Sequence, residues 1–351
     1  MGSFRNRIIN GDMRIDQRNA GASFIVTTAA GLTYTLDRWW GWTVLGSKFS
    51  VQQTSVVPLG LGFKNSVLVT SLSGVAALTG YYYGFGQYIE GYNIADLNWG
   101  TSYGTPVTVS FWVRSSIAGS YSFSLEGASF SPSYIIQYTV SAADTWQQIV
   151  STIPPPPNGT TANFPSTTAA SLRLWWDLGS SDVTYGTAAG VWVAADKLRV
   201  PGTTSLLATY GATMYLTGVQ VERGTVATPF EVRNFSQELQ LCQRYFQKSY
   251  NIASVPGTNV SGTGAIVVAA VTTTETPGSR FTVPMRANPV MVMYNPYSTT
   301  TTGVIGVLST GADTAAASAL TTGEMGFRLV SSTGLTTGLG YQYHYAANAE
   351  L

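Results

Sequence analysis

Few side chains in this sequence are of the kind that carries enzymatic chemistry. There is one histidine, His344, and one cysteine, Cys242. A catalytic triad needs a base beside its nucleophile, and a zinc site needs several Cys or His ligands, so one residue of each type favours neither. We interpret Cys242 as an apolar residue on a helix, and His344 as part of an aromatic strand or a contact between subunits.

Paired carboxylates are the remaining route to catalysis, because two acids close in space suffice to cleave a glycosidic bond. The chain has 17 Asp and Glu residues, and several have a simpler explanation in a turn or beside an arginine. Glu222 precedes Arg223, and Glu231 lies two residues before Arg233. We therefore expect a protein without enzymatic activity.

Aromatic side chains are gathered in clusters at residues 39–42, 81–92 and 175–176. Adjacent residues of a strand point to opposite faces, so one member of each tryptophan pair faces the core and the other faces away. An outward ring can stack on the apolar face of a sugar, or it can pack under a loop or against another subunit. The candidates for glycan binding are Trp40, Tyr82, Tyr92 and Trp176. Trp112 and Trp146 are expected in the core.

The elements that position these residues are short strands. Residues 36–233 contain many segments of alternating apolar and polar character, separated by Gly or Pro, which is typical of an antiparallel sandwich. Their number and spacing predict a jelly roll. The expected strands are 38–45, 49–57, 65–71, 81–90, 106–115, 120–125, 134–140, 147–153, 170–178, 190–193 and 214–222. A further strand is expected within residues 7–16, beside residues 218–223.

The spacing of the apolar residues changes from a strand period to a helix period at Asn234. Phe235, Leu239, Cys242 and Phe246 follow at i, i+4, i+7 and i+11, which predicts a helix that ends near Lys248. The chain is therefore all-β apart from one short connecting helix. We divide it into an N-terminal arm and first strand that pack on the jelly roll (1–35), a jelly-roll β-sandwich (36–233), the helix (234–250) and a smaller C-terminal β-sandwich domain (251–351).

The amino-acid composition indicates which kinds of partner the protein can have. Charged residues are 10% of the chain, against roughly 25% in an average domain, and such a surface favours oligomerisation. The net charge is +1 and basic residues form no cluster, so we expect no nucleic-acid partner. An apolar run of about 18 residues is missing, and residues 1–7 do not resemble a signal peptide. We expect no membrane insertion, synthesis in a cytoplasm, and release by lysis.

Three motifs carry a resemblance to a known family. The middle reads GVQVERG, then TPFE, then ELQLCQRYFQKSY; the start reads NRIINGDMRIDQRNAG and LDRWW; the end reads RFTVPMRANPVMVMYNP and YHYAANAEL. In this order they resemble the tail fibres and related receptor-binding tail proteins of tailed bacteriophages. The first domain also resembles jelly-roll carbohydrate-binding modules.

The resemblance implies a virion protein that forms a homotrimer, is attached to other tail or baseplate proteins through its N-terminal arm, and binds host polysaccharide or lipopolysaccharide without cleaving it. The C-terminal domain would be the tip, with contact loops at 298–303 and 309–322. Leu241, Tyr245 and His344 are the candidates for the subunit interface. Sugar-binding jelly rolls often hold a structural calcium, for which Asp12 and Asp16 are the candidate ligands, and no other cofactor is expected. The alternatives are a decoration or adaptor protein with no glycan binding, and a glycan-cleaving depolymerase.

Overall fold

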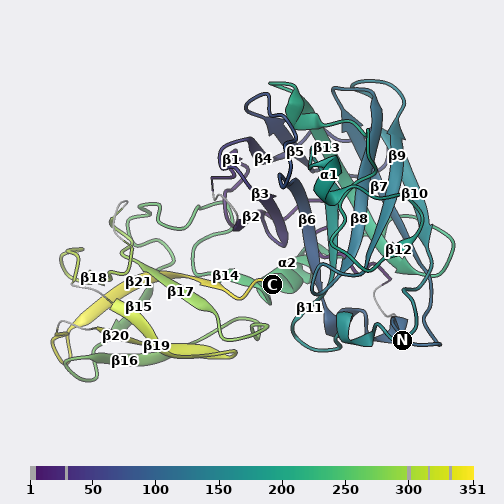
Figure 1. The fold of residues 1–351 in the computed structure, drawn as a ribbon. Helices are drawn as coiled ribbons and strands as arrows, with labels where there is room; N and C mark the ends of the chain where they lie inside the picture. The colour runs from purple at the N-terminus through teal and green to yellow at the C-terminus, as the bar shows by residue number, and fades with distance from the viewer. Residues whose placement is uncertain (1–4, 28–30, 299–301, 315–316, 332–333) are drawn as a thin grey trace. The chain divides into compact units, whose positions relative to one another are not determined.

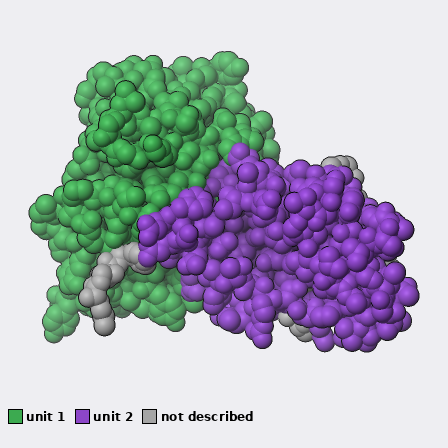
Figure 2. All heavy atoms as spheres, turned by 180° about the vertical axis from the view of Figure 1, so that it is seen from behind, with its two compact units in different colours: residues 1–14, 21–233, 351 green, residues 15–20, 234–350 purple. Residues whose placement is uncertain are grey.

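The computed structural model describes residues 5–27, 31–298, 302–314, 317–331 and 334–351, and almost all of its regular structure is β-strand (Figure 1). The chain divides into two compact units, shown in green and purple in Figure 2. The first contains residues 1–14, 21–233 and 351, and the second contains residues 15–20 and 234–350. The described part of the chain has no helix with the length and apolar character needed to cross a membrane.

The first unit is a jelly-roll β-sandwich of two antiparallel sheets. The six-stranded sheet has the order β1 (Phe24–Ile25), β4 (Phe49–Thr54), β5 (Ser66–Ser71), β13 (Thr213–Arg223), β7 (Val107–Ser115) and β10 (Gln147–Ile153). The seven-stranded sheet has the order β12 (Trp192–Val193), β9 (Ser133–Val140), β8 (Gly119–Gly127), β11 (Ala170–Asp177), β6 (Tyr83–Glu90), β3 (Trp39–Thr43) and β2 (Gly31–Leu36). A four-residue helix, α1 (Asp182–Tyr185), follows β11.

The inner faces of the two sheets meet in one apolar core. Phe111 of β7 contacts Trp176 of β11 and Phe123 of β8, with ring centroids 5.4 and 5.7 Å apart. The strand period explains the burial, because Phe111 and Val113 point inward while Trp112 between them points outward. The expected strands of residues 36–233 are all found, each within a few residues of its predicted bounds.

The N-terminal arm packs beside β13 as expected, but the strand predicted within residues 7–16 is not formed. Asn10 and Met13 have φ angles of 58° and 59°, which a strand does not allow, and they form a turn. The arm still bonds to β13, through Arg7 N to Val221 O at 2.9 Å and Val219 N to Gly11 O at 2.9 Å. Residues 15–20 belong to the second unit, where Gln17 Nε2 donates to Phe246 O at 3.1 Å.

The TPFE motif is held by a side-chain network that we call the β13 clamp, formed by Gln220, Glu222, Thr228 and Glu231. Glu222 accepts the Thr228 backbone N–H at 2.8 Å and its hydroxyl at 2.7 Å. Gln220 Oε1 accepts the Glu231 N–H at 2.9 Å, and Glu231 in turn accepts the backbone N–H groups of Arg5 and Asn6. The motif therefore connects the last strand of the sandwich to the start of the chain.

Replacing Glu222 with alanine is expected to lower the free energy of unfolding by roughly 2–3 kcal/mol, because a buried carboxylate is lost and the donors on Gln220 and Thr228 lose their acceptor. Urea denaturation measures the effect. Glu222→Gln is the matched control, since its amide oxygen can still accept the Thr228 N–H. A loss as large for Glu222→Gln as for Glu222→Ala would contradict the explanation.

The helix is shorter than predicted. The helix α2 spans Phe235–Gln243, and the next residues form β14 (Phe246–Lys248), which pairs with β21 (Gly340–Asn348). Phe246 therefore lies in a strand instead of on the helix stripe, and Phe235 is 47% exposed. α2 is part of the second unit and is not a separate connector.

The second unit is a smaller antiparallel β-sandwich built around β21. This strand pairs with β14, β15 (Ile266–Ala269), β17 (Val290–Tyr294) and β18 (Gly306–Val307). The second sheet has the order β16 (Glu275–Arg280), β20 (Gly326–Ser331) and β19 (Ala317–Gly323). Because β19 begins at residue 317, the expected contact loop 309–322 is partly strand; residues 299–301 and 315–316 of the two expected loops lie outside the described residues.

Two of the three interface candidates are corrected by burial. Tyr245 and His344 are both 0% exposed, so they contact their own chain. The His344 ring stacks on Tyr250 at 3.8 Å, its Nδ1 lies 2.9 Å from Ser249 Oγ, and burial lowers its pKa to about 4. Leu241 is half-buried on α2 and stays a prediction.

Candidate functional site

An aromatic layer covers the outer face of the seven-stranded sheet at β3, β6 and β11. On β6, Tyr83 and Phe85 point into the core, and the residue that follows each of them, on the outer face, is a glycine. A Cβ atom at Gly84 would lie 2.1 Å from Cε2 of Trp175, and one at Gly86 would lie 2.6 Å from Cη2 of Trp40. The two glycines thus leave the space in which the indole rings lie against the sheet.

A pocket of about 110 Å³ opens in this layer, and we call it the aromatic pocket. Its lining residues are Trp42, Tyr82, Phe130, Arg173, Trp175, Tyr185, Asp196 and Leu198. Trp42 contacts Phe130 and Tyr82 edge to face, with centroids 5.5 and 5.9 Å apart, and Tyr82 contacts Tyr185 at 5.9 Å. These rings pack on one another, so the pocket wall is held in place before any ligand arrives.

The polar part of the aromatic pocket is a charged triad of Glu126, Arg173 and Asp196. Nη2 of Arg173 donates to Oε2 of Glu126 and to Oδ1 of Asp196, the latter at 3.2 Å. The guanidinium also lies over the rings of Phe130 and Trp175, 4.2 and 5.0 Å from their centroids. The Asp196 side chain is 41% exposed, whereas the Glu126 side chain is fully buried.

Two carboxyl groups in the triad share one guanidinium, and this shapes their titration. Burial raises the pKa of Glu126 to about 7, although Arg173 opposes the shift. Burial also raises the pKa of Asp196, again against Arg173. The more exposed Asp196 is thus the group that presents a charge to the pocket, while Glu126 supports Arg173 from beneath.

Of the four predicted glycan-binding residues, the structure brings one into the aromatic pocket. Tyr82 lines it and is half-buried. Trp176 is corrected, because it points into the sandwich core and is 1% exposed. Trp40 does face outward as the alternation requires, but it is 0% exposed beneath the aromatic layer, where it contacts Trp42 and Trp175. Tyr92 is 61% exposed and is not among the pocket residues.

Most of the pocket was not predicted from the sequence. Trp42 and Trp175 belong to the aromatic clusters, whereas Arg173, Asp196 and Phe130 were not among the candidates. The strand period could have indicated Arg173, because Arg173 and Trp175 occupy alternate positions of β11 and share its outer face. Asp196 and Tyr185 come from the segment after β11 and can be placed only by the fold.

The two candidate calcium ligands have protein partners. Asp12 Oδ2 accepts from Arg14 Nε at 2.6 Å. Asp16 Oδ1 accepts the backbone N–H groups of Asn19 and Arg18, at 2.9 and 3.2 Å. Asp12 belongs to the first unit and Asp16 to the second. Among the described residues, no three His, Cys, Asp or Glu side chains are gathered to hold a metal, and calcium at these residues stays a prediction.

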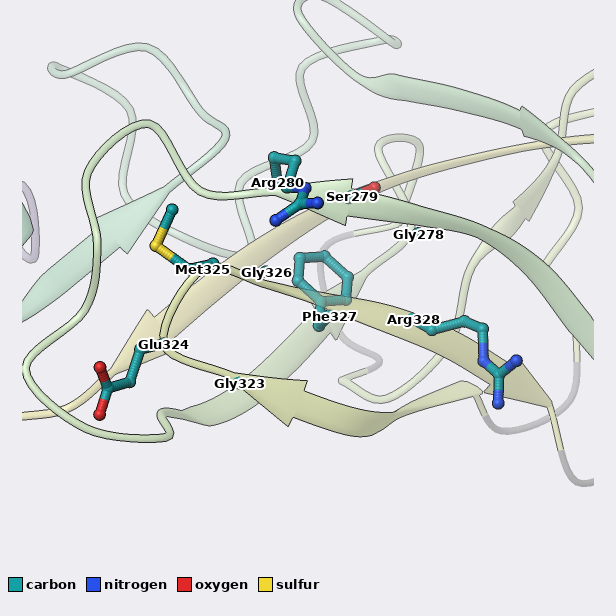
Figure 3. Close-up of a pocket in the computed structure, with 9 residues that line it drawn as sticks. All are labelled: Gly278, Ser279, Arg280, Gly323, Glu324, Met325, Gly326, Phe327 and Arg328. Carbon is teal, nitrogen blue, oxygen red and sulfur yellow. The ribbon is translucent and has the colours of Figure 1, made fainter.

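The second unit has a cavity of about 550 Å³ beside the hairpin of β19 and β20 (Figure 3). Figure 3 shows Phe327 at its centre and the side chains of Glu324 and Arg328 extending away on opposite sides. Arg280, Met325 and Arg328 are exposed, and most of the wall is backbone at Gly278, Gly323 and Gly326. Phe327 is the single aromatic side chain among the described residues that line this cavity, whereas the aromatic pocket has five.

Comparison with known proteins gives no family: no family model and no curated protein matches the chain. Solved structures similar to it include the enzymatically active domain of tailspike protein 4 of bacteriophage CBA120 (13% identity, TM-score 0.33, covering 62% of this chain and 21% of that one). A family 11 carbohydrate-binding module of Clostridium thermocellum is also similar (12% identity, TM-score 0.30, covering 59% of this chain and 98% of that one). A putative sugar binding protein of Bacteroides thetaiotaomicron is similar as well (10% identity, TM-score 0.33, covering 63% of this chain and 100% of that one). The matched part of this chain spans about a fifth of the tailspike chain, and these similarities are too low to carry an argument about function.

Proposed function

We propose that this chain is a receptor-binding protein of a bacteriophage tail, most simply a fibre, and that it binds a host surface glycan in the aromatic pocket. The observation that carries the proposal is the pocket's combination of fixed rings with a half-exposed carboxylate and a guanidinium. A sugar ring has apolar faces that suit aromatic rings and hydroxyl groups that both donate and accept hydrogen bonds. The assignment to a phage tail, as a homotrimer in the virion, rests on the motif resemblance.

The pocket supports binding of one sugar ring or a chain end. Its volume of about 110 Å³ lies below the roughly 300–1,000 Å³ typical of sites that enclose a drug-sized ligand. Asp196 can accept hydrogen bonds from sugar hydroxyls.

Binding without cleavage is the form that this geometry favours. Glycoside hydrolysis needs two carboxyl groups flanking the scissile bond, and of the described residues that line the pocket only Asp196 is a carboxylate. Glu126 lies outside the lining, beneath Arg173.

The test is binding to an array of bacterial capsular polysaccharides and lipopolysaccharides, followed by titration calorimetry on the polysaccharides that bind. Trp42→Ala and Asp196→Ala are each expected to weaken binding at least about tenfold, because each removes a pocket wall or the exposed carboxylate. Tyr92→Ala, which removes an exposed tyrosine that does not line the pocket, is the matched control and is expected to bind as the wild type does. Wild-type affinity in both pocket variants would refute the proposed site.

A depolymerase is the second candidate, and one observation favours it. Burial holds the pKa of Glu126 near 7, the range of a general acid, and Asp196 contacts the same Arg173 nitrogen. Release of reducing ends from a bound polysaccharide by the wild type, and its loss in Glu126→Gln, would establish cleavage. Unchanged polysaccharide after prolonged incubation is the outcome expected for binding alone.

A further inference from the structure

A second cavity, of about 310 Å³, lies on the outer face of the other sheet, the six-stranded one. We call it the Trp112 cleft. Trp112 was expected in the core, but β7 places it on the outer face, where it is half-exposed and lines the cleft with Phe63 and Phe230. An indole on the solvent side of a strand otherwise occupied by Thr108, Ser110 and Arg114 has no role in the sandwich core.

The floor of the cleft is shaped by a β-bulge in β13. The register of β13 against β7 shifts between Thr217 and Gln220, and Gly218 within the bulge has a φ of 62°. A Cβ atom there would lie 2.6 Å from Cζ of Phe63 and 3.2 Å from Cδ1 of Trp112. A glycine at this point therefore allows both rings to approach the backbone.

The far wall of the cleft is fixed by the β13 clamp. Phe230 belongs to the TPFE motif, between Thr228 and Glu231, whose backbone N–H groups are held by Glu222 and Gln220. Its ring contacts Phe63 edge to face, with centroids 5.3 Å apart. The aromatic walls are therefore in place without a ligand, which lowers the entropy lost on binding.

Polar side chains also line the cleft. Ser110 is 4% exposed, Trp112 is half-exposed and Gln148 is exposed. Their hydroxyl, indole N–H and amide groups can each hydrogen-bond to a ligand. At the edge of the cleft, Asp12 and Arg14 neutralise each other through the bond of 2.6 Å, so the cleft offers no net charge to a ligand.

We infer that the Trp112 cleft is a second saccharide site, which binds a neutral oligosaccharide segment independently of the aromatic pocket. Rings on two walls suit the apolar faces of sugar units, while a hydroxyl, an amide and an indole N–H suit their hydroxyl groups. The cleft measures about 310 Å³ against about 110 Å³ for the pocket, so it has room for a longer segment of a glycan chain. Sites on the outer faces of both sheets make the sandwich bivalent toward a polysaccharide.

The test uses the full chain, the same array of bacterial polysaccharides, and four variants. Trp112→Ala is expected to weaken binding of at least one neutral polysaccharide at least about tenfold, and Gln148→Ala a few-fold. Trp146→Ala is the matched control, because Trp146 is also half-exposed, packs on Tyr215 at 6.1 Å, and lines neither cavity. Trp42→Ala separates the two sites, since it is expected to leave binding in the cleft intact.

Three outcomes would overturn the inference. One is wild-type affinity of Trp112→Ala and Gln148→Ala for every polysaccharide on the array, and another is an array on which the wild type binds nothing neutral. The third is a lower solution mass of Trp112→Ala by light scattering with unchanged glycan binding, which would identify the cleft as a contact between copies of the chain.

Gln148 is exposed, so its variant reports on binding even if Trp112→Ala fails to fold. Weakened glycan binding in Trp42→Ala but not in Trp112→Ala would support the aromatic pocket alone. Weakened glycan binding in Trp112→Ala but not in Trp42→Ala would support the cleft alone.

Discussion

Replacing Arg173 with methionine is expected to lower the free energy of unfolding by about 3–5 kcal/mol at pH 8, because it leaves the Glu126 carboxylate buried without its counter-charge. The Arg173 and Glu126 side chains are 3% and 0% exposed, so water cannot replace the lost partner. The rings of Phe130 and Trp175 also lose the guanidinium that lies over them. Urea denaturation at pH 8 gives the value directly.

Two further variants make the Arg173 result specific. In the double variant Arg173→Met with Glu126→Gln, the buried charge is gone, and we expect a large part of the lost stability to return. Arg114→Met is the surface control, because Arg114 pairs with Asp144 at 3.0 Å and lies 5.1 Å from the ring of Tyr215, but the two side chains are 25% and 57% exposed. A pair of this kind contributes about 0–1 kcal/mol. Equal losses in the Arg173 and Arg114 variants would disprove the role of burial.

The second large effect is on pH dependence: stability is expected to fall by about 2–3 kcal/mol between pH 5 and pH 8. Burial raises the pKa of Glu126 from 4.5 to about 7, so between these values the folded chain holds a proton that the unfolded chain has released. Stability then decreases as pH rises through this window, at about 1.4 kcal/mol for each pKa unit of the difference. The raised pKa values of Asp177 and Asp196, both caused by burial, act in the same direction.

Calorimetric melting at constant ionic strength, from pH 5 to pH 8, measures this dependence. Glu126→Gln removes the titrating group, so its melting temperature is expected to change less over the same range than that of the wild type. A wild-type melting temperature that rises with pH over this window would show that the carboxyl groups of the triad have ordinary or lowered pKa values in the folded chain.

Most strands of the first unit could be predicted from the sequence, because a sandwich strand has one buried face and its side chains therefore alternate between apolar and polar. The two short N-terminal strands, β1 and β2, were not predicted. Trp112 shows the limit of that signal. Its strand was predicted correctly, but the core was assigned from residue type, and the period that places Phe111 inward places Trp112 outward. The helix was overextended for a related reason: Phe246 continues the apolar stripe of α2, yet pairing with β21 places it in a strand.

The candidate site was harder to predict, because facing outward is not the same as being exposed. Trp40 faces outward but lies beneath other rings, and Tyr82 reaches the pocket only because Tyr185 and Asp196 are brought to it by the fold. The charged triad joins residues 126, 173 and 196, which belong to two strands and a loop. The spacing of these three residues in the sequence does not predict that they come into contact. The contact depends on the order of the strands in the sheet.

The division of the chain has a consequence for how such proteins can exchange parts. The backbone passes from one unit to the other at 14/15, 20/21, 233/234 and 350/351. Within the second unit, Gln17 and Lys248 are joined by a bond of 2.6 Å from Nζ to the Gln17 carbonyl. A chimaera that joins residues 1–233 of this chain to a foreign C-terminal region keeps residues 15–20 without the unit on which they pack. We therefore expect such a chimaera to fold well only when the foreign region accepts this six-residue segment, or when the segment is exchanged together with it.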